Sequence, residues 1–548
     1  MTCKNKAVTG STSKFRMVQE ITTTKQNKTD NMKSKFNLIA TSFLFITCIA
    51  WQLTSFAQSG SLDLTFDTDG KVTTAIGSGS DVGNEVAIQS DGKIVVAGYS
   101  DNGNDLDFAV IRYNSNGSLD TGFGSNGKVT TDIANDDDYG NSVAIQADGK
   151  IVVAGYGRIS SNNDIVVVRY NTDGTLDLSF DSDGVVTTPI GNSSDYAFAV
   201  AIQPDGKIVV AGSSAAFVVV RYNTDGSLDN TFDQDGKATV AIGNSSEALS
   251  IAMQPDGKIV LAGYSSASGV INFAVARYHT DGILDQSFDS DGIATTDFDG
   301  FNDYAYGVAI QGDGKIVAAG ISYDSLDSDF ALVRYETDGS LDLSFDTDGM
   351  VTTDVASYIE SARSMVIQSD NKIVVSGLST IGTTSFYVLV RYDTNGILDN
   401  AFDADGIVTT TIGGSCEGQS IALQSDGKIV VAGYALIAGN LDFAVARYNN
   451  INITGVNTIS NRAAGIRIYP NPFSKQTTLQ SDRIFNNASV TVFNFLGQPV
   501  NEVTNIHGEM FTLYRNDLAA GAYFIRIMED NEVVAVDKLV ITEYMMNR

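Results

Sequence analysis

Seven acidic side chains recur at nearly the same place in a repeated segment of the chain. Each stands seven or eight residues before a glutamine of that segment, as Asp81 does before Gln89. Carboxylate oxygens are the ligands that calcium prefers, so a ring of these groups could hold a cation or a polar ligand. The alternative is a hydrogen bond that ties the same loop in every repeat and serves the fold alone. The candidate metal-ligating residues are Asp81, Asp138, Asp195, Glu247, Asp303, Glu360 and Glu417.

Tyrosines stand beside several of these acids, in segments that differ most from one repeat to the next. A rigid scaffold with variable loops on one face is a common form of binding site. The tyrosine ring stacks on a ligand while its hydroxyl forms hydrogen bonds. We therefore expect an extracellular glycan, peptide or protein to bind there, with ordinary surface tyrosines as the alternative. The candidate ligand-binding residues are Tyr139, Tyr196, Tyr304 and Tyr306, with Asp138, Asp195 and Asp303; Tyr358 has a similar setting.

Six Asp-x-Asp-Gly segments, such as residues 67–70, also suggest calcium. They lack the first Asp of an EF-hand loop, where Thr65 stands in the first copy, and they lack the distal Glu. The equivalent segment at 124–127 has no carboxylate. The simpler expectation is turn chemistry, with an ion pair to the arginine of a repeated Arg-Tyr pair such as Arg169. Calcium is the only cofactor that the sequence suggests.

The chain offers little for catalysis. It has two histidines, His279 in a predicted turn and His507 near the C-terminus. Cys3 and Cys48 belong to a predicted leader, so Cys416 has no disulfide partner and is expected to be a loop thiol. The glycines lie in turns and not in a phosphate-binding loop before a helix. No catalytic residue is predicted.

The repeat that carries these residues determines the architecture. The segment Val86–Gly98 occurs seven times, and its glutamine recurs at intervals of 57, 57, 51, 57, 57 and 56 residues. Self-similarity at a fixed period of this length is typical of propellers and solenoids. The seven glutamines are Gln89, Gln146, Gln203, Gln254, Gln311, Gln368 and Gln424.

Each repeat predicts four short strands. In the second repeat they cover 142–146, 150–155, 164–170 and a segment around 184–188. An Asp-Gly pair between the first two predicts a hairpin with a type I′ turn. The two middle strands are almost continuous in Val, Ile and Ala, which indicates a sheet buried on both faces. Four-stranded units that pack face to face around an axis form a β-propeller.

The ends of the repeat array predict how the ring closes. The array begins with an outermost strand within 61–74 and ends with a third strand at 443–448. The N-terminal strand can therefore complete the last blade and remove exposed sheet edges. Alternating short strands after residue 465 predict a separate sandwich. The predicted fold is all-β: a seven-bladed β-propeller closed by an N-terminal strand, followed by a small β-sandwich.

Charge and the N-terminus limit the location and the partners. The formal net charge of −30 excludes a nucleic-acid partner, whose phosphates require a basic surface. A basic segment after Met32, an apolar run to Trp51, and small residues at Ser55 and Ala57 predict signal-peptide cleavage before Gln58. The first 31 residues indicate either a true start at Met32 or a long leader. No membrane span is expected in the mature chain.

The propeller repeats resemble a known family. Phe232–Gly236, Gln254–Gly263 and Ala276–Gly282 are similar to the delta-60 repeats of bacterial proteins, and the likeness covers about residues 60–449. This resemblance implies a propeller-like fold and little about chemistry.

The C-terminal segment resembles a second family. Tyr469–Pro472, Leu496–Gly497, Ala520–Tyr523 and the late Lys538–Leu539 are similar, in this order, to the type A sorting domain of the type-nine secretion system. The likeness covers 466–543. It implies contact with the secretion machinery, export across the outer membrane of a Gram-negative bacterium, and then surface attachment or release.

Three functions remain open on these grounds. The first is a secreted or cell-surface, non-catalytic propeller that binds a glycan, peptide or protein through its variable face. The others are a purely structural surface protein and a secreted hydrolase or lyase. An enzyme is less favoured, because the acids recur symmetrically and histidine is nearly absent. The predicted units are a leader and signal peptide at 1–57, the propeller at 58–449, a linker at 450–465 and the sorting sandwich at 466–543.

Overall fold

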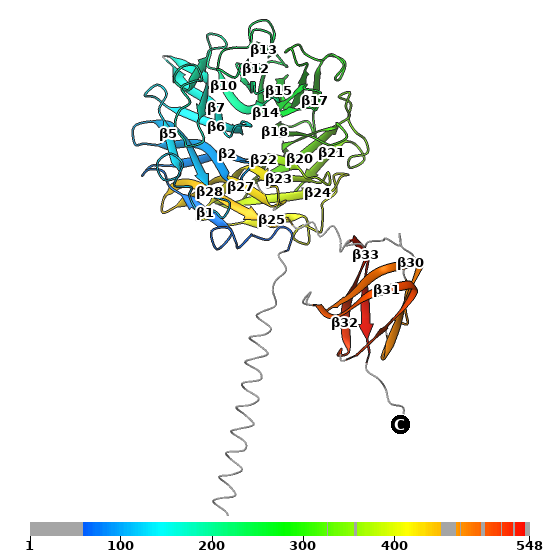
Figure 1. Cartoon of the computed structure of the whole chain (residues 1–548). Coiled ribbons are helices and arrows are strands. Elements are labelled where there is room, and N and C mark those ends of the chain that lie inside the picture. Colours follow the sequence, from blue (N-terminus) through cyan, green and yellow to red (C-terminus); the bar gives the residue numbers. More distant parts are fainter. Residues whose placement is uncertain are drawn as a thin grey trace, which may run out of the picture.

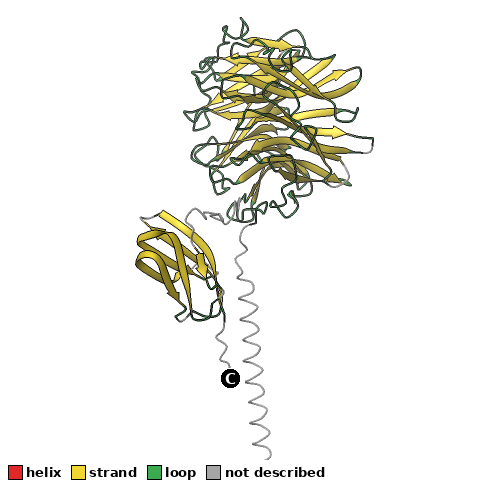
Figure 2. Ribbon diagram, turned by 90° about the vertical axis from the view of Figure 1, so that its right-hand side faces the viewer, coloured by secondary structure: helices red, strands yellow, loops and turns green. Residues whose placement is uncertain are grey.

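The structure, a computed structural model, describes residues 58–159, 161–325, 327–355, 359–450, 467–471, 473–494, 499–516, 518–529 and 532–542. The predicted leader, nearly all of the predicted linker, and Tyr358 lie outside this range. All regular elements within it are strands (Figure 2), as expected for an all-β chain. Within the same residues, no helix has the length and apolar character needed to cross a bilayer.

Residues 58–450 form seven four-stranded antiparallel blades around one axis (Figure 1). The innermost strands contact one another in a closed ring around the propeller axis. Blades five and six are also joined by a single bridge between Ser328 and Ile359. The seven-bladed propeller is thus confirmed.

Each blade has the same order of strands. The innermost strands of blades one to seven are β2 (Asp81–Ile88), β6 (Asp138–Ile145), β10 (Tyr196–Ile202), β14 (Ser245–Met253), β18 (Asp303–Ile310), β22 (Ile359–Ile367) and β26 (Cys416–Leu423). The second strands are β3 (Ile94–Asp101), β7 (Ile151–Ile159), β11 (Ile208–Ser213), β15 (Ile259–Ala267), β19 (Ile316–Tyr323), β23 (Ile373–Ile381) and β27 (Ile429–Ile437).

The outer half of each blade follows the same pattern. The third strands are β4 (Leu106–Tyr113), β8 (Asn162–Tyr170), β12 (Phe217–Tyr222), β16 (Val270–Tyr278), β20 (Ser328–Tyr335), β24 (Thr384–Tyr392) and β28 (Asn440–Tyr448). The outermost strands are β5 (Lys128–Thr131), β9 (Val185–Thr188), β13 (Lys237–Val240), β17 (Ile293–Thr296), β21 (Met350–Thr353), β25 (Ile407–Thr410) and, in blade seven, β1 (Lys71–Thr74).

The N-terminal strand closes the ring as predicted. β1 pairs with β28, with Lys71 opposite Ala446 and Thr74 opposite Phe443. In Figure 1 the blue β1 lies beside the gold β28. The preceding residues add an ion pair of 2.8 Å between Asp63 and Arg447. The last blade therefore depends on residues from both ends of the propeller.

The turns between the first two strands differ in type from the prediction. In blade one Gly92 has a φ of 83°, whereas Asp91 does not have a positive φ. The Gly92 N–H donates to the Gln89 carbonyl at 2.9 Å, and the Gln89 N–H donates to Lys93 at 2.9 Å. This is a type I turn followed by a left-handed residue, so only one position requires glycine.

Blades pack face to face through apolar side chains, as the continuous Val and Ile runs predicted. Between blades one and two, Val95 and Phe108 meet Ile151, Val153 and Val168, all fully buried. Each face thus loses its apolar surface to a neighbouring blade, which is the main source of stability in this architecture.

One polar network recurs at the end of every blade that carries the tight turns, here called the turn end. The arginine of each Arg-Tyr pair lies 2.6–2.8 Å from an aspartate that is buried or half-buried, and above a phenylalanine ring. In blade two these residues are Arg169, Asp177 and Phe180, with Lys150 also 2.9 Å from Asp177. The arginine therefore does not pair with the Asp-x-Asp-Gly carboxylates; Asp183 instead accepts the Val185 N–H at 2.9 Å, as turn chemistry requires.

The tyrosine of the Arg-Tyr pair links neighbouring blades. Its hydroxyl bonds a threonine on the outermost strand of the preceding blade, as Tyr222 does with Thr188 at 2.8 Å. Blade four is the exception, because Val240 occupies the threonine position and the buried Tyr278 hydroxyl has no partner.

The C-terminal unit is a small, separate β-structure. Its strands are β29 (Arg467–Tyr469), β30 (Gln476–Phe493), β31 (Pro499–Tyr514), β32 (Gly521–Glu529) and β33 (Glu532–Ile541). β30 pairs with β31, β29 and β32 along different parts of its length. Leu479, Val490, Leu513, Ile525 and Leu539 fill its core.

Candidate functional site at the channel mouth

The end of the propeller opposite the tight turns, here called the mouth end, carries the connections that vary in sequence. The loop before one innermost strand contacts the hairpin of the preceding blade there. For example, the Asp195 N–H donates to the Asn163 carbonyl at 2.7 Å, and the Asn440 amide donates to the Ser78 carbonyl at 2.8 Å. The two variable sets of loops therefore share one face.

The innermost strands begin earlier than the sequence predicted. In blade two β6 starts at Asp138, whereas the alternation of apolar residues indicated a start near Ser142. A β-bulge at Asn141 interrupts the pairing with β7, and all seven innermost strands carry the equivalent irregularity. A bulge breaks the alternation of faces. Tyr139, Tyr196, Tyr304 and Tyr306 therefore lie on strands, not in loops.

The seven candidate acids do not form one ring. Five stand eight residues before the repeat glutamine, and a shift of one residue turns a strand side chain to the other face. At this position blades four and seven have Ser246 and Cys416, while Glu247 and Glu417 come one residue later. Cys416 is accordingly a buried strand residue and not a loop thiol. The five equivalent acids are Asp81, Asp138, Asp195, Asp303 and Glu360.

These five carboxylates point into the junctions between blades and are fully buried. Each accepts the backbone N–H five residues earlier, as Asp138 does from Ile133 at 2.7 Å and Glu360 from Val355 at 2.8 Å. They hold the loop that enters the innermost strand. Burial raises the pKa of Asp138 to about 7 and that of Asp303 to about 6. The expectation that Asp138, Asp195 and Asp303 line a ligand site beside the tyrosines is therefore wrong, because a ligand cannot reach them.

Glu247 and Glu417 lie on the other face of their strands from the five buried acids, as the tyrosines do. Both are half-buried and lie opposite a tyrosine of the second strand. Glu247 hydrogen-bonds the Tyr264 side chain, and Glu417 hydrogen-bonds that of Tyr434. Tyr139, Tyr196 and Tyr304 occupy the same position as these two acids in blades two, three and five.

The tyrosines form two contacting groups. In the first tyrosine arc, Tyr139 lies between Tyr99 and Tyr156, with ring centroids 5.0 and 4.8 Å away. The Tyr156 ring is 4.8 Å from Tyr196, which is 6.1 Å from Phe198. In the second arc Tyr304 contacts three other tyrosines. Its partners are Tyr264 at 4.9 Å, Tyr306 at 6.3 Å and Tyr323 at 6.2 Å.

The bulge residues form a further set that sequence reasoning missed. Their side chains reach the neighbouring blade: Asn84 donates to the Gly140 carbonyl at 2.9 Å, and the Arg363 guanidinium lies 4.7 Å from the Tyr306 ring centroid. Because the innermost strands form the ring nearest the propeller axis, side chains that bridge these strands lie around that axis. The sequence could have indicated these residues, because the position five residues before the repeat glutamine differs strongly from one repeat to the next. The bulge residues are Asn84, Asn141, Phe198, Leu249, Tyr306, Arg363 and Gln419.

Glu85 is an acid of the innermost strands that stands at a different position from the seven candidate acids. Glu85 follows the bulge in blade one, where blades two, four, six and seven have serine. Burial raises its pKa to about 7, although hydrogen bonds from Ser142 and the Val143 N–H favour the charged form. Glu85 can therefore change its charge near neutral pH, and no other blade has an acid at the equivalent position.

Three carboxylates approach one another at the junction of blades five and six. Oxygens of Asp329, Asp354 and Glu360 lie within 4.8 Å of one another. Nearby acids and burial raise the pKa of Asp329 to about 6. Of the seven acids first considered, only Glu360 joins such a group in the described part of the chain. Calcium usually takes about six to eight oxygen ligands, so three carboxylates supply part of a site.

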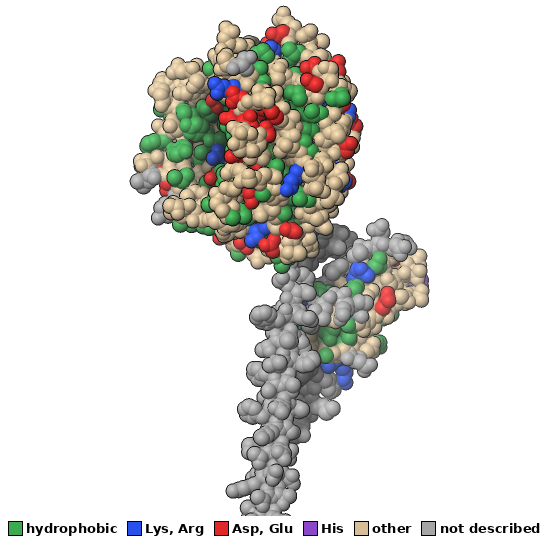
Figure 3. Space-filling model, turned by 90° about the vertical axis from the view of Figure 1, so that its left-hand side faces the viewer, with side chains coloured by type: hydrophobic (Ala, Val, Ile, Leu, Met, Phe, Trp, Pro, Cys, Tyr) green, Lys and Arg blue, Asp and Glu red, His purple; other side chains and the backbone are tan. Residues whose placement is uncertain are grey.

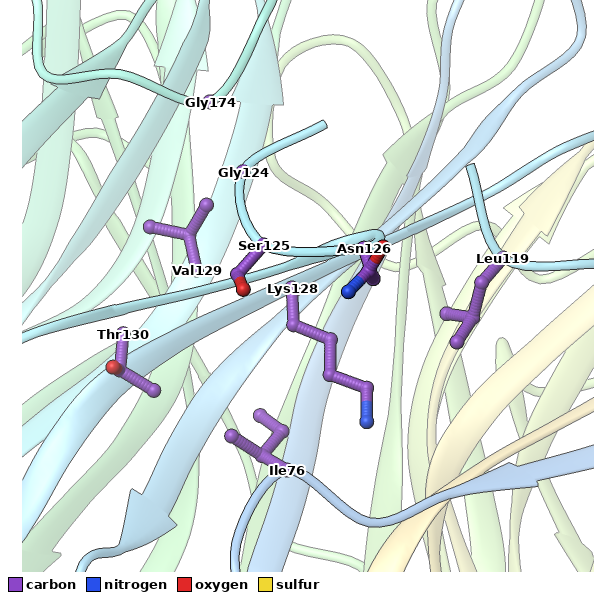
Figure 4. Close-up of a pocket in the computed structure, with 9 residues that line it drawn as sticks. All are labelled: Ile76, Leu119, Gly124, Ser125, Asn126, Lys128, Val129, Thr130 and Gly174. Carbon is purple, nitrogen blue, oxygen red and sulfur yellow. The ribbon is translucent and has the colours of Figure 1, made fainter. Parts of the chain in front are cut away.

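The hollows that the structure describes lie away from the mouth. Figure 4 shows one at the outer edge of blade one, where Lys128 extends beside Ile76 and bonds the Ala75 carbonyl at 2.6 Å. A second, lined by Pro255 and Arg277, lies at the turn end and uses residues of the repeated network. Neither gathers the residues that vary between blades. In Figure 3, acidic side chains gather on the propeller side in view, in keeping with the net charge of −30.

Comparisons with known families match both parts of the chain. The family described as a β-propeller domain of unknown function (DUF5122) matches residues 89–123, 146–180, 203–232, 254–288, 311–345, 368–402 and 424–451. The secretion system C-terminal sorting domain matches residues 467–542. The seven repeats thus match the first family and the C-terminal unit matches the second, as the two resemblances implied.

Several solved structures match the chain at low identity. A fungal alcohol oxidase of the AA5 family is 13% identical, with 86% of this chain and 98% of that chain covered and a TM-score of 0.39. A PL25 ulvan lyase is 11% identical, with 69% and 96% covered and a TM-score of 0.42. A virginiamycin B lyase from Staphylococcus aureus is 11% identical, with 63% and 92% covered and a TM-score of 0.34. Likenesses this distant carry no argument about activity. No curated protein matches the chain.

Proposed function

We propose that this chain is a secreted or surface-attached binding protein, without catalytic activity of its own, that takes a glycan at the mouth of its propeller. The sorting-domain match at 467–542 supports export and contact with the secretion machinery of a Gram-negative outer membrane. The propeller then presents its mouth to the outside of the cell.

The observation that carries this proposal is the first tyrosine arc. Four tyrosine rings from three blades contact one another. The fold does not require an aromatic residue at their positions in the blade. Tyr139 and Tyr196 share their position with Val82, Ser361 and Glu417 in other blades, so the blade tolerates apolar, small and charged residues there. Half-buried aromatic rings that share one surface are the usual platform for the apolar face of a sugar ring.

The polar neighbours of the arc favour a glycan over an apolar peptide. Asn84, Asn141, Glu247, Glu417 and Gln419 offer amide and carboxylate groups along the same ring of strands. These groups suit the many hydroxyls of a saccharide. Among the described residues, the Glu247 and Glu417 carboxylates pair with tyrosines, not with each other or with a histidine. General acid–base catalysis therefore has no support here.

A glycan array tests the proposal. The secreted full-length protein should bind a defined set of glycans, and Tyr139→Ala combined with Tyr156→Ala should remove that binding. Tyr514→Ala is the matched control, because Tyr514 is exposed in the C-terminal unit. Binding of protein ligands but of no glycan would identify a peptide or protein partner instead, and retention of glycan binding by the double variant would contradict the site.

A further inference from the structure

Arg363 is unlike every other arginine of the propeller that is at least half-buried. The seven arginines of the Arg-Tyr pairs each have a carboxylate within 2.8 Å. Within the described part of the chain, no ion pair within 4.0 Å involves Arg363, and its buried Nε has no hydrogen-bond partner, although its side chain hydrogen-bonds that of Tyr306. A guanidinium nitrogen that is buried without an acceptor is costly and calls for an explanation.

The position of Arg363 indicates what it faces. It is the bulge residue of β22, so no residue of β23 lies opposite it, and its side chain reaches across to blade five. The Tyr306 ring, 4.7 Å from the guanidinium carbon, holds it by a cation–π contact. The other six bulge residues are uncharged. One positive charge therefore stands on the ring that lines the channel of a strongly acidic protein.

We propose that Arg363 binds the anionic group of an acidic saccharide, either a carboxylate or a sulfate. The guanidinium is planar and presents its donors as a fork that matches both groups. Tyr306 and Tyr304 beside it continue into the second tyrosine arc, which would stack the sugar ring that bears the anion. This inference rests on the proposed glycan site and narrows its ligand to acidic saccharides.

The negative charge of the protein also bears on how an acidic saccharide would be recognised. A protein with a net charge of −30 repels polyanions at long range, so selection against neutral glycans must come from a local contact. Glu247 and Glu417, at the adjacent position of other innermost strands, would repel an anion placed against them. The anion would therefore have to contact Arg363 directly.

Three matched probes test the proposal on the full-length protein. They are cellotetraose, the tetramer of β-1,4-linked glucuronate, and sulfated cellotetraose, measured by calorimetry at constant ionic strength. At least one acidic probe should bind at least about tenfold more tightly than cellotetraose, which equals about 1.4 kcal/mol. Arg363→Gln should reduce that ratio to about one. Equal binding of all three probes by the unaltered protein would overturn the proposal.

The variants have controls within the chain. Glutamine is acceptable at a bulge position, since Gln419 occupies the equivalent place in β26. Arg363→Lys should keep part of the acid preference, because lysine retains the charge but not the fork. Arg158→Gln removes a guanidinium that is 3.7 Å from Asp136 on an exposed hairpin and should change nothing. Loss of the preference in Arg158→Gln would show that net charge, not Arg363, selects the ligand.

A second readout separates failure of this inference from failure of the glycan site. Saturation-transfer NMR with free glucuronate, free sulfate-bearing glucose and glucose does not depend on the fit of a tetramer. Transfer to an acidic sugar that disappears in Arg363→Gln supports the proposal even if Tyr139→Ala has no effect, in which case the first tyrosine arc is not the site. Equal transfer in both proteins, or none in either, overturns the role of Arg363 and leaves the proposed glycan site to its own test.

Discussion

The two ends of the propeller are built under different constraints. At the turn end, every blade repeats the same arginine, aspartate, lysine and phenylalanine, with Arg–Asp distances of 2.6–2.8 Å. Toward the mouth end, the innermost strands carry asparagine, phenylalanine, leucine, tyrosine, arginine or glutamine at one bulge position. Stability thus depends on the repeated end, and the varied end is free to meet a ligand. Changes at the two ends should have separable effects.

Removal of the N-terminal clasp should have the largest effect. A chain that lacks residues 58–74 leaves the edge of β28 unpaired and Arg447 without Asp63. Exposed sheet edges promote aggregation, and an unpaired buried charge is strongly destabilising. We expect loss of cooperative unfolding or aggregation, measured by calorimetry and light scattering. A soluble protein with an unchanged melting temperature would show that β1 is not the clasp.

Breaking one copy of the repeated network should cost less but remain large. Asp177→Asn keeps the shape but leaves Arg169 and Lys150, at 2.7 and 2.9 Å, without their carboxylate. Removing one partner of a buried ion pair typically costs about 3–5 kcal/mol. Denaturant unfolding should show this loss. Asp148→Asn, an exposed carboxylate 3.8 Å from Lys150, is the control and should change little; equal effects of the two would contradict the network.

The buried acids of the mouth end should show a characteristic pH dependence. The pKa of Asp138 is about 7 in the folded protein, above its ordinary value of 3.8. Such a group contributes stability at low pH that is lost as the pH rises through the folded pKa. Asp138→Asn imitates the protonated form, so its melting temperature should exceed that of the unaltered protein increasingly between pH 5 and about 7 and then level off. Parallel pH profiles for the two proteins would contradict this account.

The smallest expected effect is a gain. Val240→Thr places a hydroxyl where six other blades have the threonine that bonds the next blade's tyrosine, and it gives the buried Tyr278 hydroxyl a partner. One such hydrogen bond contributes about 0.5–1.5 kcal/mol. The free energy of unfolding should rise by this amount. The gain should vanish in a Tyr278→Phe background, and a gain that persists there would have another cause.

The sequence predicted the ring well because the repeats are strong signals. The seven glutamines, the Arg-Tyr pairs and the lone strand before residue 75 predict the number of blades and their closure. The site was predicted less well. A bulge at Asn141 shifts the register, so Asp138 and Tyr139, although adjacent, serve different surfaces. The alternation of residues along a strand does not reveal a bulge. It therefore gave no reason to place Glu247 and Asp303 on different faces of their strands.

Arg363 illustrates the other limit of sequence reasoning. An arginine in an inner strand attracts no attention until the structure shows that none of the described carboxylates forms an ion pair with it. Pairing between distant blades depends on geometry across the ring, which no local pattern contains. The repeated arginines, by contrast, come with their aspartate eight residues later in six blades.

The most direct test of the account measures ligand affinity and stability on the same mouth variant. Calorimetry with the best glycan of the array should show that Tyr139→Ala weakens binding about thirtyfold, since a stacking residue in a hot spot contributes about 2 kcal/mol. Its melting temperature should stay near that of the unaltered protein, because Tyr139 is half-buried and no repeated contact requires it. Unchanged affinity, or a loss of affinity that only follows a loss of folding, would contradict the proposed division between the two ends.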